Sequence, residues 1–275
     1  MSAPVGRLAP TPSGHLHLGN ALAFAAAWLS ARAAGGRLLL RVEDLDGGRA
    51  RAEIADSQRA DLSWLGLTWD DETPAQSQRA YSLAGVPAYR CRCSRRERLA
   101  GGCACRDQPR ADDGAPGLAG TWRLAAPRAP VALTDRALGR LELPVDEPVL
   151  MRDGQAAYPL AVVVDDARDG VSEVVRGADL VDATPAQLVI HAALGLPAPS
   201  YLHVPVLVGA DGKKLSKSHG ATELRSLRQR GLTPGHIWAR LLPLLGLASL
   251  DPAAFDAARV RRGPFRIDDE GRVLE

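Results

Sequence analysis

The chain has 275 residues and a net charge of +2, and 46% of its residues are hydrophobic, enough for the core of one large or two small domains. The near-neutral charge excludes a general polyanion-binding protein, so any RNA affinity must come from local patches. No apolar run reaches the roughly 18 residues of a membrane span, and the N-terminus lacks the basic and apolar stretches of a secretory signal. We therefore expect a cytoplasmic monomer with no membrane partner.

The opening segment predicts a βαβ unit with a polar turn. Residues 6–9 are predicted as a buried strand, 21–34 as a helix and 37–43 as a second strand. Prolines and a glycine force a turn before the helix, and that turn carries His15 and His17. Free backbone N–H groups at a helix N-terminus favour anion binding. A sharp turn with two solvated histidines is the alternative.

The four cysteines form a CxC pair at Cys91 and Cys93 and a second pair at Cys103 and Cys105. Four thiolates on two short turns fit a tetrahedral zinc ion, and four protein ligands would leave no open position for water. We therefore predict one structural zinc ion per chain. Redox disulfides and four inert thiols are the alternatives.

The stretch that follows the cysteines predicts mostly strands. They are expected at residues 121–124, 131–134 and 139–143, and in a hairpin over 149–158 that turns at Asp153-Gly154. The apolar run 160–164 predicts a buried parallel strand, which would place Asp165 and Asp166 at its carboxyl end, where α/β sheets bind ligands.

The third part of the chain predicts a strand followed by helices. Residues 174–180 are expected to form a strand and turn, and Thr184 is expected to be the N-cap of a helix that runs through Leu194. Two amphipathic helices are predicted near the end, over residues 222–230 and 233–245.

The three lysines of the chain all lie in one loop, at Lys213, Lys214 and Lys217, whereas every other basic residue is arginine. Lysine offers a compact, flexible point charge suited to a moving phosphate, and arginine a rigid fork. Chance clustering under codon bias is a weak alternative.

Several motifs together resemble a known family. His17-Leu18-Gly19-Asn20 resembles the HIGH motif of class I aminoacyl-tRNA synthetases, and residues 214–218 resemble their KMSKS loop. Residues 7–19 are similar to the opening of glutamyl-tRNA synthetases, and residues 40–46 and 61–70 extend the match. The short chain and the cysteine cluster resemble most the glutamyl-queuosine tRNA(Asp) synthetases, paralogues without an anticodon-binding domain. A shortened segment before Cys91 departs from the family pattern.

The resemblance implies an α/β fold, a class I synthetase Rossmann-type parallel sheet with a zinc-binding insertion and a C-terminal helical region like a stem-contact domain. The first half of the catalytic domain is expected at residues 1–86 and the insertion at 87–147. The second half would then span 148–212, and the KLSKS loop with the helical region 213–275.

The implied activity is ATP-dependent activation of L-glutamate to glutamyl-adenylate, with Mg²⁺ on the phosphates, and transfer of glutamate to queuosine in the anticodon of tRNA(Asp). The residues implied around glutamate are Arg7, Ala9, Thr11, Glu43, Tyr158 and Arg176. Those implied for ATP are His17, Gly19, Asn20, Lys214, Ser216 and Lys217. Those implied for zinc are Cys91, Cys93, Cys103 and Cys105.

Three other functions stay open at this point. A truncated glutamyl-tRNA synthetase would charge a tRNA 3′ end, although no anticodon domain is recognisable. A non-catalytic binding module would not need intact His17, Glu43 and Lys217. Another HIGH-type nucleotidyltransferase would not need the pair of Arg7 and Glu43 for an acidic amino acid. Which arginine binds which glutamate carboxylate is also left open.

Overall fold

The computed structural model describes residues 3–94, 96–98, 103, 105–107, 119–127, 129–213, 215 and 222–274. The chain opens with the predicted βαβ unit, in which β1 and β2 pair in parallel and α1 crosses between them. The second strand is shorter than predicted, but Glu43 N still donates to Pro10 O, so the extended chain continues beside the first turn. The elements of this part are β1 (Val5–Leu8), α1 (Leu18–Ala33), β2 (Arg37–Leu40), α2 (Ala52–Trp64) and β3 (Asp71–Glu72).

A second sheet lies beside β1 and has the order β10, β11, β6, β7, with β10 and β11 parallel. Ser172 N, just before β10, donates to Val5 O at 2.9 Å, which brings the carboxyl ends of β1 and β10 to the same edge. The elements of this part are β6 (Val131–Asp135), β7 (Gly139–Leu143), β10 (Glu173–Gly177), α5 (Thr184–Ala193) and β11 (Ser200–Val204). The predicted α/β class with parallel strands is confirmed.

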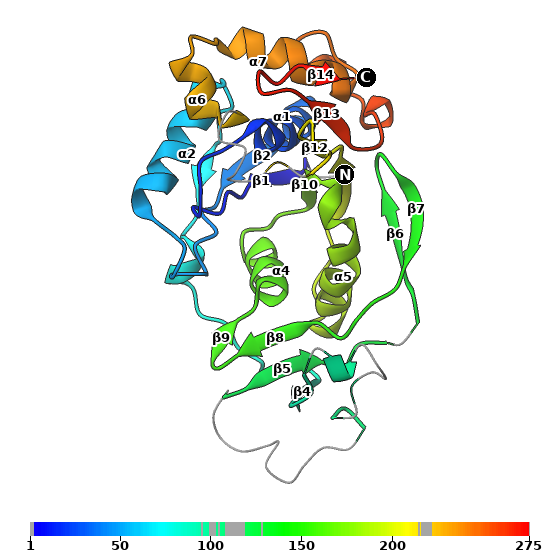
Figure 1. Cartoon of the computed structure of the whole chain (residues 1–275). Coiled ribbons are helices and arrows are strands. Elements are labelled where there is room, and N and C mark those ends of the chain that lie inside the picture. Colours follow the sequence, from blue (N-terminus) through cyan, green and yellow to red (C-terminus); the bar gives the residue numbers. More distant parts are fainter. Residues whose placement is uncertain are drawn as a thin grey trace.

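An antiparallel sheet of order β4, β5, β8, β9 lies at the end of the molecule opposite the C-terminal elements (Figure 1). Its strands are β4 (Ala88–Cys91), β5 (Thr121–Leu124), β8 (Val149–Arg152) and β9 (Gln155–Ala156). The predicted hairpin turn is confirmed, with φ of 48° at Asp153 and 81° at Gly154. Strand β5, from the predicted insertion, pairs with β8, from the predicted second half of the catalytic domain. The division of the chain into four parts stays a prediction.

The strand predicted over residues 160–164 is wrong, because this run lies inside the helix α4 (Tyr158–Arg168). Leu160, Val162 and Val163 are buried against α5 and β8, so the helix is apolar on more than one side. A short apolar run cannot distinguish a buried strand from a buried helix. Asp165 and Asp166 therefore lie on a helix and not at the end of a strand.

The C-terminal part forms short helices and a small sheet above α1 (Figure 1). The two predicted helices are present, but the second ends early at Leu241 and continues as a 3₁₀ turn over Leu242–Leu245. The elements are β12 (Leu207–Val208), α6 (Leu224–Gln229), α7 (Pro234–Leu241), β13 (Phe265–Ile267) and β14 (Val273–Leu274). The 3₁₀ turns elsewhere are Gln76–Gln78, Ala178–Ala183, Pro252–Ala254 and Ala257–Arg259.

The main core surrounds α1, whose leucines and alanines pack against β1, β2 and the C-terminal helices. Trp238 of α7 ties these parts together, since its indole N–H donates to Leu65 O at 3.1 Å after α2. Within the described part of the chain, no helix is both long and apolar enough to cross a membrane.

Candidate active site

A cavity of about 400 Å³ lies at the carboxyl ends of β1 and β10. The structure brings all six residues predicted for glutamate and three of those predicted for ATP to its wall. These residues are Arg7, Ala9, Thr11, His17, Gly19, Asn20, Glu43, Tyr158 and Arg176. Lys214, Ser216 and Lys217 lie outside the described residues.

His17 is the N-cap of α1, and its side chain accepts backbone hydrogen bonds through Nδ1. Gly19 N donates to it at 3.1 Å and Asn20 N at 3.4 Å, while Asn20 Oδ1 accepts from His17 N in return. An imidazole nitrogen that accepts carries no proton, so the neutral ring holds its proton on Nε2. Two of the N–H groups expected to be free for an anion are thus capped, and the His17 ring itself becomes a donor.

Gly19 allows the imidazole to lie against the first turn of the helix. A Cβ at this position would lie 3.0 Å from Cε1 of His17, closer than side-chain atoms normally approach. A glycine at this position also lets a ligand approach the backbone closely. The structure adds that a side chain there would also crowd the capping histidine.

Two buried arginines face the cavity with different surroundings. Arg7 Nε pairs with Asp166 Oδ1 at 3.3 Å, so an acid of the protein balances its charge. Arg176 makes no ion pair among the described residues, and its Nη1 has no hydrogen-bond partner there although it is buried. Burial is the largest influence on the Arg176 guanidinium and lowers its pKa. A buried, unbalanced guanidinium is suited to an anionic ligand.

Glu43 is a buried acid in the wall of the cavity and is 7% exposed. Burial raises the pKa of its carboxyl, and the charges of Arg41 and Arg7 act against that rise. Arg41, which is not among the residues that line the cavity, donates from Nη2 to Glu43 Oε1 at 3.2 Å. The buried charged groups that line the cavity are thus two arginines and one carboxylate, and the exposed Asp179 also lines it.

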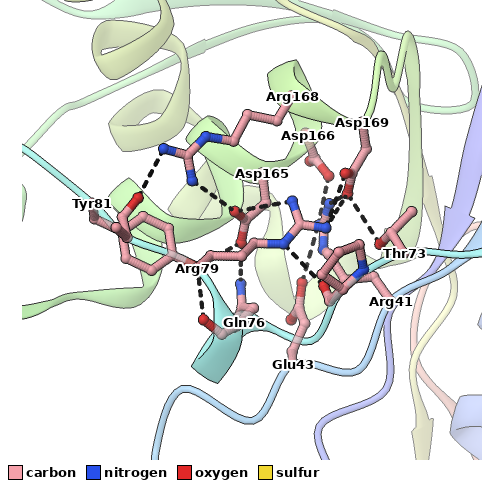
Figure 2. Close-up of polar contacts among 12 residues, drawn as sticks. Arg41, Glu43, Thr73, Gln76, Arg79, Tyr81, Asp165, Asp166, Arg168 and Asp169 are labelled. Atoms are coloured by element: carbon pink, nitrogen blue, oxygen red, sulfur yellow. Dashed lines mark hydrogen bonds and ion pairs between the residues drawn. The ribbon is translucent and has the colours of Figure 1, made fainter.

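Two aspartates at the C-terminal end of α4, Asp166 and the C-cap residue Asp169, pair with buried arginines at the cavity (Figure 2). Asp166 Oδ1 accepts from Arg41 Nη2 at 2.6 Å as well as from Arg7, and Asp169 Oδ2 accepts from Arg41 Nη1 at 3.0 Å. Burial acts to raise the pKa of Asp166, but the charges of Arg7 and Arg41 outweigh it and lower that pKa. The helix that the sequence misassigned therefore supports the wall of the cavity from behind.

The Gln76-Ser77-Gln78-Arg79 segment connects to the same helix. Gln76 Nε2 donates to Asp165 Oδ2 at 3.0 Å, and Arg79 pairs with both Asp165 and Asp169 (Figure 2). Ser77 Oγ donates at 2.6 Å to Asp44, the residue that follows Glu43 in the chain. This segment thus holds α4 and the chain after β2 together.

A second cavity of about 650 Å³ adjoins the first and shares Thr11, Glu43 and Tyr158 with it. Its other lining residues are Leu45, Asp46, Gly47, Gly48, Gln76, Gln155 and Ala156. The two cavities together offer room for a large substrate on either side of Glu43 and Tyr158.

The four cysteines lie together at the end of β4 and in the loop after it. Their sulfur atoms all lie within 4.8 Å of one another, and the closest separations are 3.3 Å, 3.5 Å and 3.7 Å. The cysteines are free thiols and form no disulfide. This cluster could bind a metal ion.

Sequence reasoning missed the residues that support the site. Gln58 of α2 holds the first turn, since its Nε2 donates to Thr11 O at 3.0 Å and to Gly14 O at 2.8 Å. Arg41 is fully buried, and a charge inside an otherwise apolar predicted strand was a signal that could have revealed it. His203 contacts Arg176 from the neighbouring strand, and Asp135 contacts His203; neither residue carried a local signal.

Comparison with known proteins agrees with this geometry. The family described as tRNA synthetases class I (E and Q), catalytic domain, matches residues 5–99 and 91–249. A glutamyl-Q tRNA(Asp) synthetase of Nocardia farcinica is 43% identical over 294 residues, covering 97% of this chain and 94% of its own. That of Deinococcus radiodurans is 44% identical and covers 86% and 87%. A glutamate–tRNA ligase of Oleidesulfovibrio alaskensis is 41% identical, covering 85% of this chain and 55% of its own.

A solved structure has the same fold. The glutamate tRNA ligase of Elizabethkingia meningosepticum, in complex with its amino acid, superposes with a TM-score of 0.79 at 22% identity. The match covers 96% of this chain and 67% of that one. With the family match and the relatives above, the chain belongs to the class I tRNA synthetases of the E and Q type, within the group of the glutamyl-Q tRNA(Asp) synthetases.

Proposed function

We propose that this enzyme activates L-glutamate with ATP to glutamyl-adenylate and transfers the glutamyl group to queuosine in the anticodon of tRNA(Asp). The observation that carries the proposal is one cavity in which two buried arginines face one buried carboxylate, beside the helix that His17 caps. The names of the relatives support the choice of RNA.

The charges of the cavity match those of glutamate. Its two carboxylates would bind Arg7 and Arg176, and its ammonium would bind Glu43. Ala9, Thr11 and Tyr158 complete the wall around the amino acid. Because Asp166 already balances Arg7, the unbalanced Arg176 would bind a carboxylate with the larger net gain.

Adenylate formation needs no nucleophile from the protein. The glutamate carboxylate attacks the α-phosphorus of ATP, and pyrophosphate leaves with the electrons of the broken P–O bond. The protein's tasks are to hold the reactants together and to stabilise charge on the phosphorus. His17 would donate from Nε2 to a phosphate oxygen, since Nδ1 is engaged with the backbone. Gly19 and Asn20 would lie at the adenosine end.

Lys214, Ser216 and Lys217 would bind the β- and γ-phosphates, because their sequence resembles the KMSKS loop. Magnesium would accompany ATP, held mostly by the phosphates and by few protein ligands. Both assignments follow from the family and from the chemistry of ATP.

The second cavity supports the entry of a nucleoside. An acceptor that binds beside Thr11, Glu43 and Tyr158 would lie against the bound glutamyl group. The cyclopentenediol of queuosine offers hydroxyl groups like those of a terminal ribose, so the same adenylate could esterify it. The arginines of residues 90–98, 225–230 and 259–266 could contact the RNA phosphates.

The cysteine cluster would hold one structural zinc ion. Four thiolates at about 2.3 Å from a central zinc ion lie about 3.8 Å from one another, close to the separations of 3.3 Å to 3.7 Å between these sulfur atoms. Zinc bound by Cys91, Cys93, Cys103 and Cys105 would stabilise the fold at the end of β4. Cys103 Sγ lies 3.3 Å from Cys91 Sγ and 3.7 Å from Cys93 Sγ, within reach of a shared ion.

We also infer that the enzyme works in the cytoplasm, where tRNA and ATP occur together, and acts as a monomer, because residues of one chain line the whole amino-acid cavity. Charging of a tRNA 3′ end is the second candidate, favoured by the similarity to a glutamate–tRNA ligase.

One experiment separates the candidates. Labelled glutamate and ATP are incubated with the enzyme and with tRNA(Asp) that carries or lacks queuosine, or with tRNA(Glu), and the RNA is then cut with nucleases. Label on the anticodon fragment of queuosine-bearing tRNA(Asp) alone is the expected result. Label on a 3′-terminal adenosine would support the second candidate instead.

The amino acid is tested by pyrophosphate exchange without RNA. Exchange should be strong with L-glutamate and far weaker with L-glutamine, because an amide leaves a buried arginine without its carboxylate. Equal exchange with both would contradict the assigned cavity.

A further inference from the structure

A buried chain of three polar side chains ends at the cavity. Asp135 of β6 accepts at Oδ2 from His203 Nδ1 at 2.7 Å, and Nε2 of His203 lies 3.1 Å from Nε of Arg176. The exposed fractions of Asp135, His203 and Arg176 are 2%, 1% and 6%. The three residues come from β6, β11 and β10, which are consecutive strands of one sheet.

The arginine fixes the direction of the hydrogen bonds in this chain, although the Thr184 hydroxyl also lies 3.3 Å from His203 Nε2. Nε of a guanidinium always donates, so Nε2 of His203 must accept and carry no proton. The proton of the neutral imidazole is then on Nδ1, where it is donated to Asp135. Burial lowers the pKa of His203, although the hydrogen bond to Asp135 acts to raise it, and this keeps the ring neutral.

The remaining nitrogen atoms of Arg176 are also accounted for. Nη2 donates to Thr184 Oγ1 at 2.9 Å, and that hydroxyl donates to Leu180 O at 3.1 Å. The predicted N-cap role of Thr184 is wrong: the helix begins at this residue, and its hydroxyl holds the arginine. Nη1 is the nitrogen without a partner among the described residues.

We propose that Asp135 and His203 are positioning residues for Arg176. Asp135 selects the tautomer of His203, and His203 then accepts the Nε edge of the guanidinium, so that Nη1 is left to bind a carboxylate of the amino acid. This inference rests on the proposed function, since it specifies how the same cavity recognises its acidic substrate.

The oxygen atoms of Asp135 explain why an acid is needed. Its Oδ1 accepts from the backbone N–H groups of Ala137 and Leu138, each at 2.9 Å, which fixes the carboxylate and directs Oδ2 to His203. Oδ2 also accepts from the backbone N–H of His203 at 3.0 Å. In an Asp135→Asn variant the amide oxygen should stay with Ala137 and Leu138, because the opposite orientation would turn the amide nitrogen toward two backbone N–H groups rather than one. The amide nitrogen would then face the imidazole. The ring would then need its proton on Nε2, opposite the Nε–H of Arg176.

The test compares Asp135→Asn and His203→Phe with a control. Phenylalanine keeps the ring that stacks on Tyr201 at 5.9 Å but removes the acceptor. Both variants should raise the KM for glutamate in pyrophosphate exchange at least tenfold, while the KM for ATP and kcat change less than threefold. His191→Phe is the matched control, because His191 is also buried but makes no hydrogen bond to Arg176 in the described part of the chain. This variant should leave the KM for glutamate unchanged.

A second readout does not depend on activity. Nitrogen-15 NMR of histidine-labelled enzyme should show that the proton of His203 is on Nδ1. The His203 signal is identified as the one that disappears in His203→Phe, or otherwise as the one that shifts in Asp135→Asn. Asp135→Asn should move the proton to Nε2. A wild-type Nε2–H tautomer, or a wild-type KM for glutamate in folded Asp135→Asn enzyme, would overturn the inference. Absence of glutamate-dependent exchange in the wild type would instead refute the proposed function, and the NMR result would still decide the tautomer.

Discussion

Replacing Arg41 with methionine would test whether the charges behind the cavity stabilise the fold. Arg41 is fully buried and pairs with Glu43, Asp166 and Asp169 at 3.2 Å, 2.6 Å and 3.0 Å. Methionine keeps much of the side chain's length and apolar stem but removes the charge. Three buried or nearly buried carboxylates would then lose a shared cation.

The expected loss is large because removing one partner of a buried ion pair leaves the other charge uncompensated, which costs about 3–5 kcal/mol. For 275 residues, an unfolding entropy of about 2.1 cal/mol/K per residue gives about 0.6 kcal/mol/K. The same loss should therefore lower the Tm by about 5–9 °C.

The loss should also depend on pH. In the wild type the arginine charges hold the pKa of Asp166 below its usual value, so this group contributes stability above its unfolded pKa. In Arg41→Met the pKa of the abandoned acids rises, so that lower pH neutralises them and favours the folded variant. The difference in the free energy of unfolding should thus be larger at pH 8 than at pH 5.5.

Denaturant unfolding at both pH values, followed by fluorescence and circular dichroism, measures this difference. Arg59→Met is the matched control, because Arg59 pairs with Asp56 and Glu72 at the surface and its loss should cost less than about 1 kcal/mol. Equal losses in the two variants at pH 8, or a loss in Arg41→Met that does not change with pH, would refute the reasoning.

Three further variants test other parts of the structure. Gly19→Ala should lower the rate of glutamate-dependent exchange by about 10–100-fold, because its methyl group crowds the capping imidazole. Gly235→Ala is the control, since Gly235 is also at the second position of a helix but has room for a Cβ, and this variant should be active. Equal rates in the two variants would contradict the crowding. Burial raises the pKa of Asp61 to about 6, so its contribution to stability is lost as pH rises through 6, and Asp61→Asn should raise the free energy of unfolding at pH 8 by up to about 3 kcal/mol. Asp56→Asn, at the surface of the same helix, should change it little, and the same gain there would refute the role of burial. Cys91→Ser should abolish stoichiometric metal binding and lower the Tm while glutamate exchange persists, and a normal metal content would contradict the four-cysteine site.

Local chemistry in the sequence predicted the elements that begin or end at special residues. The turn before α1 and the hairpin at Asp153-Gly154 each depend on residues a few positions apart. The candidate cavity was predictable for a related reason: its residues come from recognisable motifs at the ends of β1, β2 and β10. The cysteine cluster was likewise predictable, because its four residues lie in two CxC pairs that are close together in the sequence.

The strand predicted over residues 160–164 was wrong because the secondary structure of this run depends on contacts with segments that are distant in the chain. Five apolar residues in a row are compatible with a strand or a helix, and only their packing between α5 and β8 decides for a helix. The sheet pairing of β6 with β11 shows the same limit, since the parallel partner lies far away in the chain.

The sequence by itself determined the fold class, the family and half of the residues that line the cavity, because these depend on composition and on short motifs. The tertiary structure alone decided how those residues are held. Asp166 reaches Arg7 across 159 positions, and Asp135 reaches His203 across 68. A charge can be recognised in a sequence, but whether it is balanced depends on partners that meet only when distant strands and helices pack, and in this enzyme that balance distinguishes Arg7 from Arg176.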